Sequence, residues 1–161
     1  MFLISMFNFQ DILFYTSFIP LIGISLLIFI NPEQQILLKI VAFNFSSFPF
    51  LILLSIWGIF KKSLGTFQFV SKLVWIPILN LNVTLAVDGI SLFFLLLTTL
   101  LIPLCILISW NSIRINLKGY LIAFLIIEFF LIGVFCVLDV LMFYIFFESI
   151  LPPMFLIIGV W

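Results

Sequence analysis

Long apolar runs, separated by short polar segments, dominate this chain. Each run approaches the roughly 20 residues that a helix needs to cross a bilayer. The runs are continuous rather than alternating, which indicates helices and not the strands of a membrane barrel. The pattern predicts five membrane-spanning helices, at about residues 12–30, 40–60, 90–110, 120–138 and 141–161. We therefore expect an all-α integral membrane protein that forms a single unit over residues 1–161.

Residues 61–87 follow a different pattern, in which apolar and polar side chains alternate. A period of two is typical of strands, and Pro77 falls between two alternating stretches. The sequence therefore predicts a β-hairpin outside the membrane, between the second and third spans. This hairpin could brace a neighbouring subunit or be a simple capped loop. Exposed apolar strands usually need a cover, which favours the brace.

The composition excludes several classes of protein. Of the 161 residues, 66% are hydrophobic and 7% are charged, whereas soluble domains carry roughly 25% charged residues. Six basic residues balance six acidic ones and histidine is absent, so no basic patch for nucleic acid is expected. Cys105 and Cys136 lie in apolar runs, where cysteine usually serves packing. No cluster of cysteine and histidine predicts a metal or iron–sulfur site.

The targeting signals and the orientation are less informative. The N-terminal residues carry no positive charge, so they resemble neither a secretory signal nor a transit peptide. The 23 phenylalanines fit an AT-rich genome, and a chain this apolar would be hard to import, so organelle encoding is the hypothesis; composition alone does not separate it from a bacterial origin. Lysine and arginine are divided evenly between the two predicted membrane sides, so the positive-inside rule does not select an orientation.

Glu148 lies near the middle of the last apolar run, Phe143 to Trp161. An ionisable residue at the bilayer centre costs roughly 2.5–3.5 kcal/mol on insertion scales and usually marks an ion or proton pathway. Apolar surroundings penalise the charged form of a carboxylate, which suits a group that holds and releases a proton. The functional hypothesis is therefore a proton-path acid. The alternative is a protonated glutamate that hydrogen-bonds to another helix.

Prolines accompany this acid. Pro152 has no N–H to donate to the carbonyl of Glu148, and Pro153 has none for the carbonyl of Ser149. We therefore expect a helix break beside Glu148 that leaves acceptors for water, although a purely structural kink would have the same sequence. Pro103 is expected to kink the third span for the same reason.

Two further acids fall in the last third of the chain. Glu128 is placed nearer the start of the fourth span than its middle. Membership of a proton relay and a satisfied acid near the interface are equally compatible with that position. Asp139 lies in the short link before the fifth span. There it is expected to cap the helix, with a second role in tuning nearby charges.

Other polar residues have ordinary structural explanations. Asp88 precedes the third span, at the place of a helix N-cap. The hydroxyl groups of Thr98, Thr99 and Ser149 could line a water path. In membrane helices, however, such groups more often bond to their own backbone, and this is the favoured interpretation.

Three segments are together similar to one family. They are Val87 to Phe94, Leu101 to Pro103, and Phe143 to Glu148 with the following Pro153-Met154. They resemble chain 4 of NADH–ubiquinone oxidoreductase, an antiporter-like membrane subunit of respiratory complex I. The similarity is convincing from about Phe67 to Trp161, and before that only the span lengths agree.

The resemblance implies a proton-translocating subunit of the mitochondrial inner membrane, with its N-terminus facing the intermembrane space. In that family the fifth-helix glutamate, which maps onto Glu148, lies on the proton path. The acid nine residues earlier maps onto Asp139. The complex transfers electrons from NADH to ubiquinone. FMN, iron–sulfur clusters and ubiquinone bind elsewhere in the complex, so no cofactor is expected in this chain. The expected partners are other membrane-arm subunits and lipids.

Two departures from the family pattern matter. Pro152 stands where relatives usually carry an aliphatic residue. Family members also have many more helices, with lysines that pair with the fifth-helix glutamate, whereas this sequence has no lysine after Lys118. The resemblance therefore implies half of a proton channel. A split chain with a second polypeptide is favoured over an incomplete or degenerate subunit.

Two rival functions stay open. The first is a subunit of a multi-subunit cation/proton antiporter, whose membrane chains share the fold. The second is a structural scaffold in which the carboxylates only hold helices together. Co-purification with flavin-bearing partners, or with none, would separate complex I from the first rival. In the second, replacing Glu148 with glutamine would affect stability rather than transport.

Overall fold

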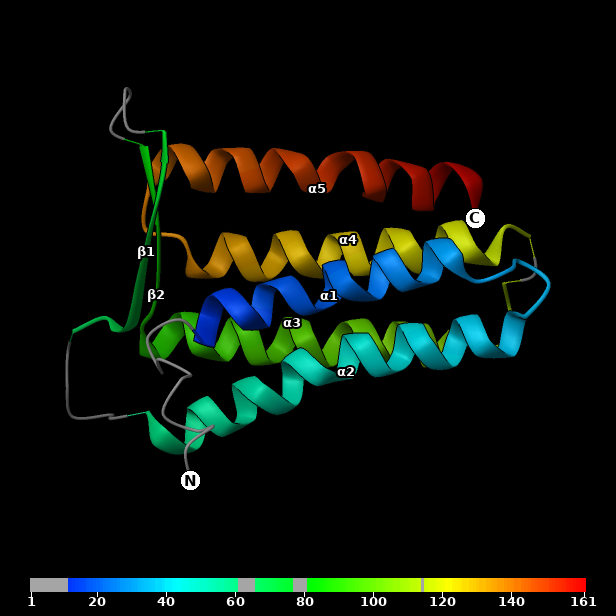
Figure 1. Cartoon of the computed structure of the whole chain (residues 1–161), viewed down its shortest axis with the longest axis horizontal. Helices are drawn as coiled ribbons and strands as arrows, with labels where there is room; N and C mark the ends of the chain where they lie inside the picture. The colour runs from blue at the N-terminus through cyan, green and yellow to red at the C-terminus, as the bar shows by residue number, and fades with distance from the viewer. Residues whose placement is uncertain (1–11, 61–65, 77–80, 114) are drawn as a thin grey trace.

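In a computed structural model, the described part of the chain forms five helices and one hairpin (Figure 1). The structure describes residues 12–60, 66–76, 81–113 and 115–161. The elements are α1 (Ile12–Phe29), α2 (Gln35–Ile59), β1 (Gln68–Ile76), β2 (Leu81–Val87), α3 (Gly89–Ile108), α4 (Leu117–Cys136) and α5 (Val140–Val160). All five helices are long and apolar enough to cross a membrane. The chain is a multi-pass helical membrane protein, as predicted.

The helix boundaries follow the predicted spans closely, with one exception. Four helices begin and end within three residues of the prediction. α2 begins at Gln35, whereas the predicted span begins at Ile40. The prediction started the span after Lys39, but residues 36–38 before it are also apolar, and Lys39, whose side chain reaches the carbonyl of Trp110, does not interrupt the helix.

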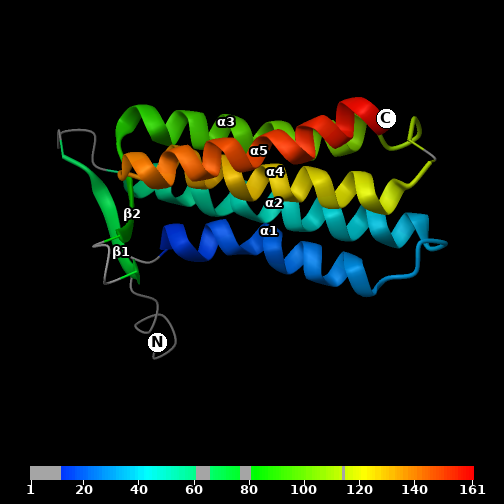
Figure 2. The same ribbon diagram turned by 90° about the horizontal axis from the view of Figure 1, so that it is seen from above.

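The helices run along one axis, with the hairpin at one end of the bundle (Figure 2). α4 is the central helix, since it contacts α1, α2, α3 and α5. It also has the largest buried share of the five spans. Proline occurs inside every other helix but not inside α4. The helix on which the others pack therefore keeps an unbroken ladder of backbone hydrogen bonds.

Gly23 lets α1 approach its neighbours closely. A Cβ atom added at Gly23 would lie 2.7 Å from Cβ of Phe45 in α2 and 3.2 Å from Cδ1 of Leu125 in α4. Lipid is as apolar as the side chains, so membrane helices associate largely through such close packing. The contact between α1 and α2 at this level thus depends on the absence of a side chain.

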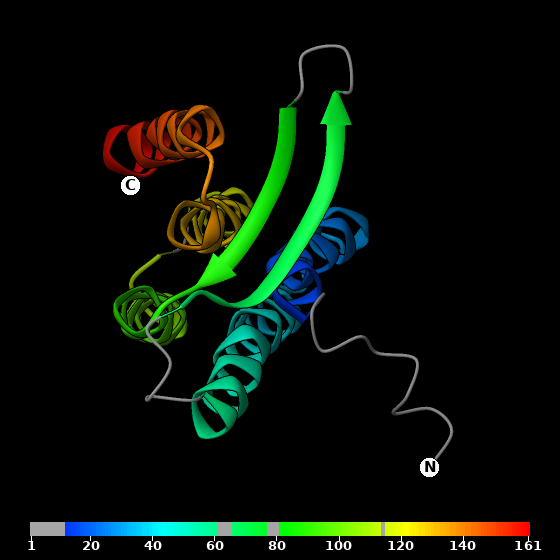
Figure 3. The same cartoon turned by 90° about the vertical axis from the view of Figure 1, so that its left-hand side faces the viewer.

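The predicted hairpin is confirmed. β1 and β2 pair antiparallel and cross the end of the bundle at which α1 begins (Figure 3). Leu85 and Val87 of β2 are buried, and they share one apolar cluster with Leu92 of α3 and Ile132 of α4. Pro77, which was expected between the strands, lies outside the described residues. The apolar face of β2 is therefore covered by the ends of the helices.

Asp88 begins α3 as predicted. Its carboxylate accepts a hydrogen bond from Ser91 N at 2.7 Å, and Ser91 Oγ accepts one from Asp88 N at 3.0 Å. This reciprocal pair is a capping box, which satisfies two N–H groups that the first turn would otherwise leave free. The hydrogen bonds from Ser91 hold the pKa of the Asp88 carboxyl below its usual value.

Replacing Asp88 with alanine should lower the free energy of unfolding by about 1 kcal/mol, because the first turn of α3 loses its acceptor. The folded-state pKa lies below the unfolded one. The contribution is therefore complete above the unfolded pKa and is lost as pH falls through the folded pKa. Thermal unfolding in detergent at several pH values measures both effects. The variant Asp88→Asn should keep most of the stability, and an alanine variant as stable as the parent would contradict the cap.

Replacing Gly23 with alanine should lower the free energy of unfolding by about 1–3 kcal/mol, because the new methyl group overlaps the Phe45 side chain. Gly58 of α2 is a matched control, since nothing lies within 4 Å of a Cβ added there. The variant Gly58→Ala should be neutral or slightly stabilising, because alanine favours helix over glycine. Equal unfolding temperatures for the two variants would count against the close packing of α1.

Candidate functional site

Glu148 lies on the outward face of α5. The buried residues of α5 are Met142, Ile150 and Pro153, and Phe146 packs on α4. At about 100° per residue, Glu148 is turned by about 200° from both Phe146 and Ile150. Its side chain is accordingly exposed on the surface of the described bundle. The carboxylate therefore points away from α4, toward whatever surrounds α5 in the membrane.

Glu128 lies at the same depth as Glu148. Glu128 is eight residues before Cys136, the last residue of α4, and Glu148 is eight residues after Val140, the first of α5. The two helices are antiparallel with a three-residue link, so each acid lies about 12 Å from that end at 1.5 Å per residue. The prediction that Glu128 is nearer the start of its span is wrong. Position 128 lies near the middle both of the predicted span, residues 120–138, and of α4, in which Glu128 is residue 12 of 20.

Glu128 is buried without a partner. Its side chain is 1% exposed, and neither Oε1 nor Oε2 has a hydrogen-bond partner among the described residues. Withdrawing a carboxyl group from water without such a bond costs free energy, and far more so if the group is charged. The position of Glu128 in the middle of α4 and the lack of a hydrogen-bond partner among the described residues speak against the alternative of a satisfied acid near the interface.

Tyr144 is a neighbour of Glu148 that the sequence analysis did not single out. It precedes Glu148 by one helical turn and is exposed on the same helix. The side chains of Tyr144 and Glu148 interact. The spacing of four residues was the available signal, since positions i and i+4 are neighbours on a helix.

Asp139 caps α5, as predicted. Its carboxylate accepts a hydrogen bond from Leu141 N at 3.3 Å. Nine residues separate it from Glu148, which corresponds to about 13 Å along the helix axis. Asp139 therefore lies at the hairpin end of the bundle, while Glu128 and Glu148 lie deep in the spans on different faces. The structure does not bring the three acids into one cluster.

The hydroxyl groups near the site bond to their own helices, as predicted. Thr98 and Thr99 donate to the carbonyl of Leu95, at 3.0 and 2.7 Å. Ser149 donates to the carbonyl of Ile145 at 2.7 Å. These three hydroxyl groups therefore donate their hydrogen bonds to backbone carbonyls and not to the carboxylates.

α3 and α5 pass through their prolines as continuous helices. The residues beside Glu148 therefore stay helical, while the expected kink and the access of water at these prolines stay predictions. Pro152 still lacks the N–H that would bond to the carbonyl of Glu148. A backbone acceptor thus lies next to the acid.

Two of the three described lysines bond to backbone carbonyls at the end of the bundle far from the hairpin. Lys39 donates to the carbonyl of Trp110 and lies 5.6 Å above its ring. Lys118 donates to two carbonyls at the end of α1, at 2.7 and 3.0 Å. Both lie at the end of the bundle opposite the hairpin, and Lys72 belongs to β1. None of these three lysines is placed to neutralise Glu148.

Comparison with known proteins identifies the family. No family model matches the sequence. The NADH-ubiquinone oxidoreductase chain 4 of Chondrus crispus is 54% identical over 149 residues, which are 92% of this chain and 30% of the relative. That of Arabidopsis thaliana is 51% identical over 142 residues, 88% of this chain and 29% of the relative. That of Metridium senile is 45% identical over 159 residues, 96% of this chain and 32% of the relative.

The chain belongs to the NADH-ubiquinone oxidoreductase chain 4 family. It spans about 30% of the length of these curated relatives and corresponds to an N-terminal portion of them. The resemblance seen in the sequence motifs is thereby confirmed, and it extends into the first two helices, where only span lengths had agreed.

Side chains that could ligate a metal ion do not cluster in the described part of this chain. In the described residues, no group of three or more histidine, cysteine, aspartate or glutamate side chains could hold a metal ion. Cys105 and Cys136 are free and lie on different helices.

Replacing Glu128 with leucine should raise the free energy of unfolding by about 1–3 kcal/mol, because an unpaired buried carboxyl is exchanged for an apolar group of similar size. Thermal unfolding of the detergent-solubilised protein measures the change. Glu33→Leu in the exposed link between α1 and α2 is the control, with an expected change of less than about 0.5 kcal/mol. A loss of stability in Glu128→Leu would show that the carboxyl has a polar partner.

Proposed function

We propose that this chain is a membrane-arm subunit of NADH-ubiquinone oxidoreductase in the mitochondrial inner membrane, encoded in the organelle. Its part is proton translocation coupled to electron transfer from NADH to ubiquinone. The position of Glu148 carries the proposal. A carboxylate at mid-depth on an outward helix face costs free energy in hydrocarbon unless it binds a proton or pairs with a cation, and such acids usually mark a proton or ion path. Similarity to the chain 4 relatives supports membership of the complex.

Glu148 would work through the charge opposite it. The ionised form is disfavoured in hydrocarbon and becomes favourable when a cation lies within about 4–6 Å. Approach of a basic side chain would therefore release the proton from Glu148, and its withdrawal would return one. Movement of charge in a neighbouring element is thus converted into proton uptake and release at a single carboxylate.

The cation would come from helices outside the matched portion. About 70% of the length of the chain 4 relatives has no counterpart in this sequence, because the chain spans about 30% of it. Those helices would cover the outward face of α5, either on a continuation of this chain or on a second polypeptide. Other membrane-arm subunits and lipids would complete the surroundings.

The other acids have separate parts in this proposal. Asp139 lies at the hairpin end of α5, where it can tune the charge near the entrance or exit of the path. Glu128 lies at the same depth as Glu148 but inside the bundle, where it would serve as an interior proton acceptor. Pro152 leaves the backbone carbonyl of Glu148 without its helical donor. This carbonyl would accept a hydrogen bond from a water molecule that lies between the acids and the membrane surface.

Electron transfer belongs to other subunits in this proposal. FMN and iron–sulfur clusters need phosphate-binding loops or several cysteines, and this sequence has two cysteines and no histidine. Ubiquinone would likewise bind elsewhere. The contribution of this chain is the carboxylate on α5.

Replacing Glu148 with glutamine should strongly reduce or abolish proton pumping by the complex while leaving its assembly intact, because an amide of the same shape cannot exchange a proton. Proton uptake into sealed vesicles, divided by NADH oxidised, measures the effect. Glu33→Gln is the control, since Glu33 is exposed in the link between α1 and α2. Pumping at the parent ratio in Glu148→Gln would refute the proposed role. Loss of assembly would instead support a structural role.

A further inference from the structure

We propose that β2 is a positioning element for α5, which holds the link between α4 and α5 by its backbone and thereby sets where Glu148 lies. The geometry rests on the contacts of the hairpin. The functional consequence rests on the proposed role of Glu148.

The link is paired with β2 at two successive residues. Leu138 N donates to the carbonyl of Thr84 at 2.9 Å. Val137 forms an antiparallel bridge with Leu85. The segment 137–138 therefore behaves as a short third strand beside β2, although it connects two membrane helices.

β2 is itself firmly held. Leu85 and Val87 are 3% and 0% exposed, and they pack against residues of α3 and α4 in one cluster. Asp88, which directly follows β2, forms the capping box of α3. β2 thus connects the start of α3 to the end of α4, and its position is fixed by both.

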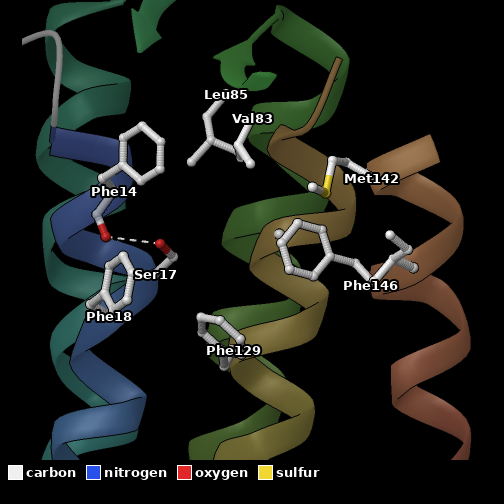
Figure 4. A pocket seen from close by; sticks show the side chains of 10 residues that line it. Phe14, Ser17, Phe18, Val83, Leu85, Phe129, Met142 and Phe146 are labelled. Atoms are coloured by element: carbon white, nitrogen blue, oxygen red, sulfur yellow. Dashed lines mark hydrogen bonds between the residues drawn. The ribbon is translucent and has the colours of Figure 1, made fainter. Parts of the chain in front are cut away.

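Apart from the pairing of the link with β2, the first turns of α5 are supported mainly by α4 among the described helices. The Phe146 ring lies so close to Gly133 of α4 that a Cβ atom added there would be 3.1 Å from Cδ2 of Phe146. On the side facing α1 there is a hollow of about 250 Å³ instead of packed side chains. Figure 4 shows Phe14 and Met142 on opposite sides of this hollow, below Leu85 of β2.

The far end of α5 has a separate tether. Trp161 Nε1 donates to the carbonyl of Ile115 at 2.6 Å, and its ring meets Tyr120 edge to face. α5 is therefore tied near both ends. The tether at Trp161 lies 13 residues beyond Glu148, whereas Leu138 lies ten residues before it and directly precedes the cap Asp139.

The pairing of residues 137–138 with Thr84 and Leu85 of β2, here called the clamp, governs the direction of the Glu148 side chain. A shift of α5 by one residue relative to α4 would move Glu148 by about 1.5 Å along the axis and turn it by about 100°. A quarter turn would carry the carboxylate from the outward face toward the side of α4. Holding residues 137–138 against β2 prevents that shift at the point where α5 begins.

The variant Leu138→Pro tests the clamp, because it removes the N–H that bonds to Thr84 while the extended Val137 (φ −76°, ψ 136°) accepts a following proline. Leu138→Ala is the matched control, which keeps the N–H and loses a side chain that is 42% exposed. Both variants are compared in the assembled complex. Hydrogen exchange over residues 139–148 and protons pumped per NADH oxidised are measured together.

We expect exchange in the first turns of α5 to become about threefold to tenfold faster in Leu138→Pro and to stay unchanged in Leu138→Ala. The pumping ratio should fall at least about twofold in the proline variant alone, since Glu148 would no longer be held in place. Unchanged exchange in the proline variant would overturn the clamp. Faster exchange with the parent pumping ratio would overturn its role in positioning Glu148.

The failure of the clamp and the failure of the proposed function are distinguishable. If Glu148→Gln pumps at the parent ratio, the proposed function is refuted, and the clamp is judged on hydrogen exchange alone. If Glu148→Gln stops pumping and Leu138→Pro does not, the proposed function stands and the positioning role is refuted.

Discussion

Placing a carboxylate in hydrocarbon costs free energy, and this cost constrains both mid-span acids of the structure. The two acids lie at the same depth but in different surroundings. Glu128 is enclosed by the helices of the bundle and has no hydrogen-bond partner among the described residues. Glu148 is left on the outer face of α5. The first acid can stay neutral where it is, whereas the second needs a cover that the described helices do not provide.

Most other polar groups of the spans are committed to the backbone. Hydroxyl groups bond to carbonyls of their own helices, as Thr99 does to Leu95. Lys118 bonds to the carbonyls that end α1, which lack donors of their own because the helix stops there. The described part of the chain therefore offers acids at mid-depth but no base to match them. A cation that pairs with Glu148 would therefore have to approach the outward face of α5 from outside the described helices.

The sequence predicted the elements but not their faces. Apolar length marked the spans, a period of two marked the hairpin, and an aspartate before an apolar run marked the caps at Asp88 and Asp139. Lipid-facing sides are as apolar as packed sides, however, so the helices carry no amphipathic pattern that shows which side is inside. The burial of Glu128 and the exposure of Glu148 were therefore not predictable. Small residues such as Gly23 and Gly133 were the available signal for packed faces.

Depth and direction of the two acids have different determinants. Their equal depth follows from chain length alone, because eight residues separate each from the link between α4 and α5. Their directions depend on contacts that are distant in sequence. The Phe146 ring fixes α5 against Gly133, and the bond from Leu138 to Thr84 fixes where α5 begins. An insertion in the link would alter depth and direction together, while loss of the bond to β2 would free the direction and leave the residue count unchanged. The hairpin therefore helps to set the direction of Glu148 through the start of α5, although the hairpin itself lies outside the spans.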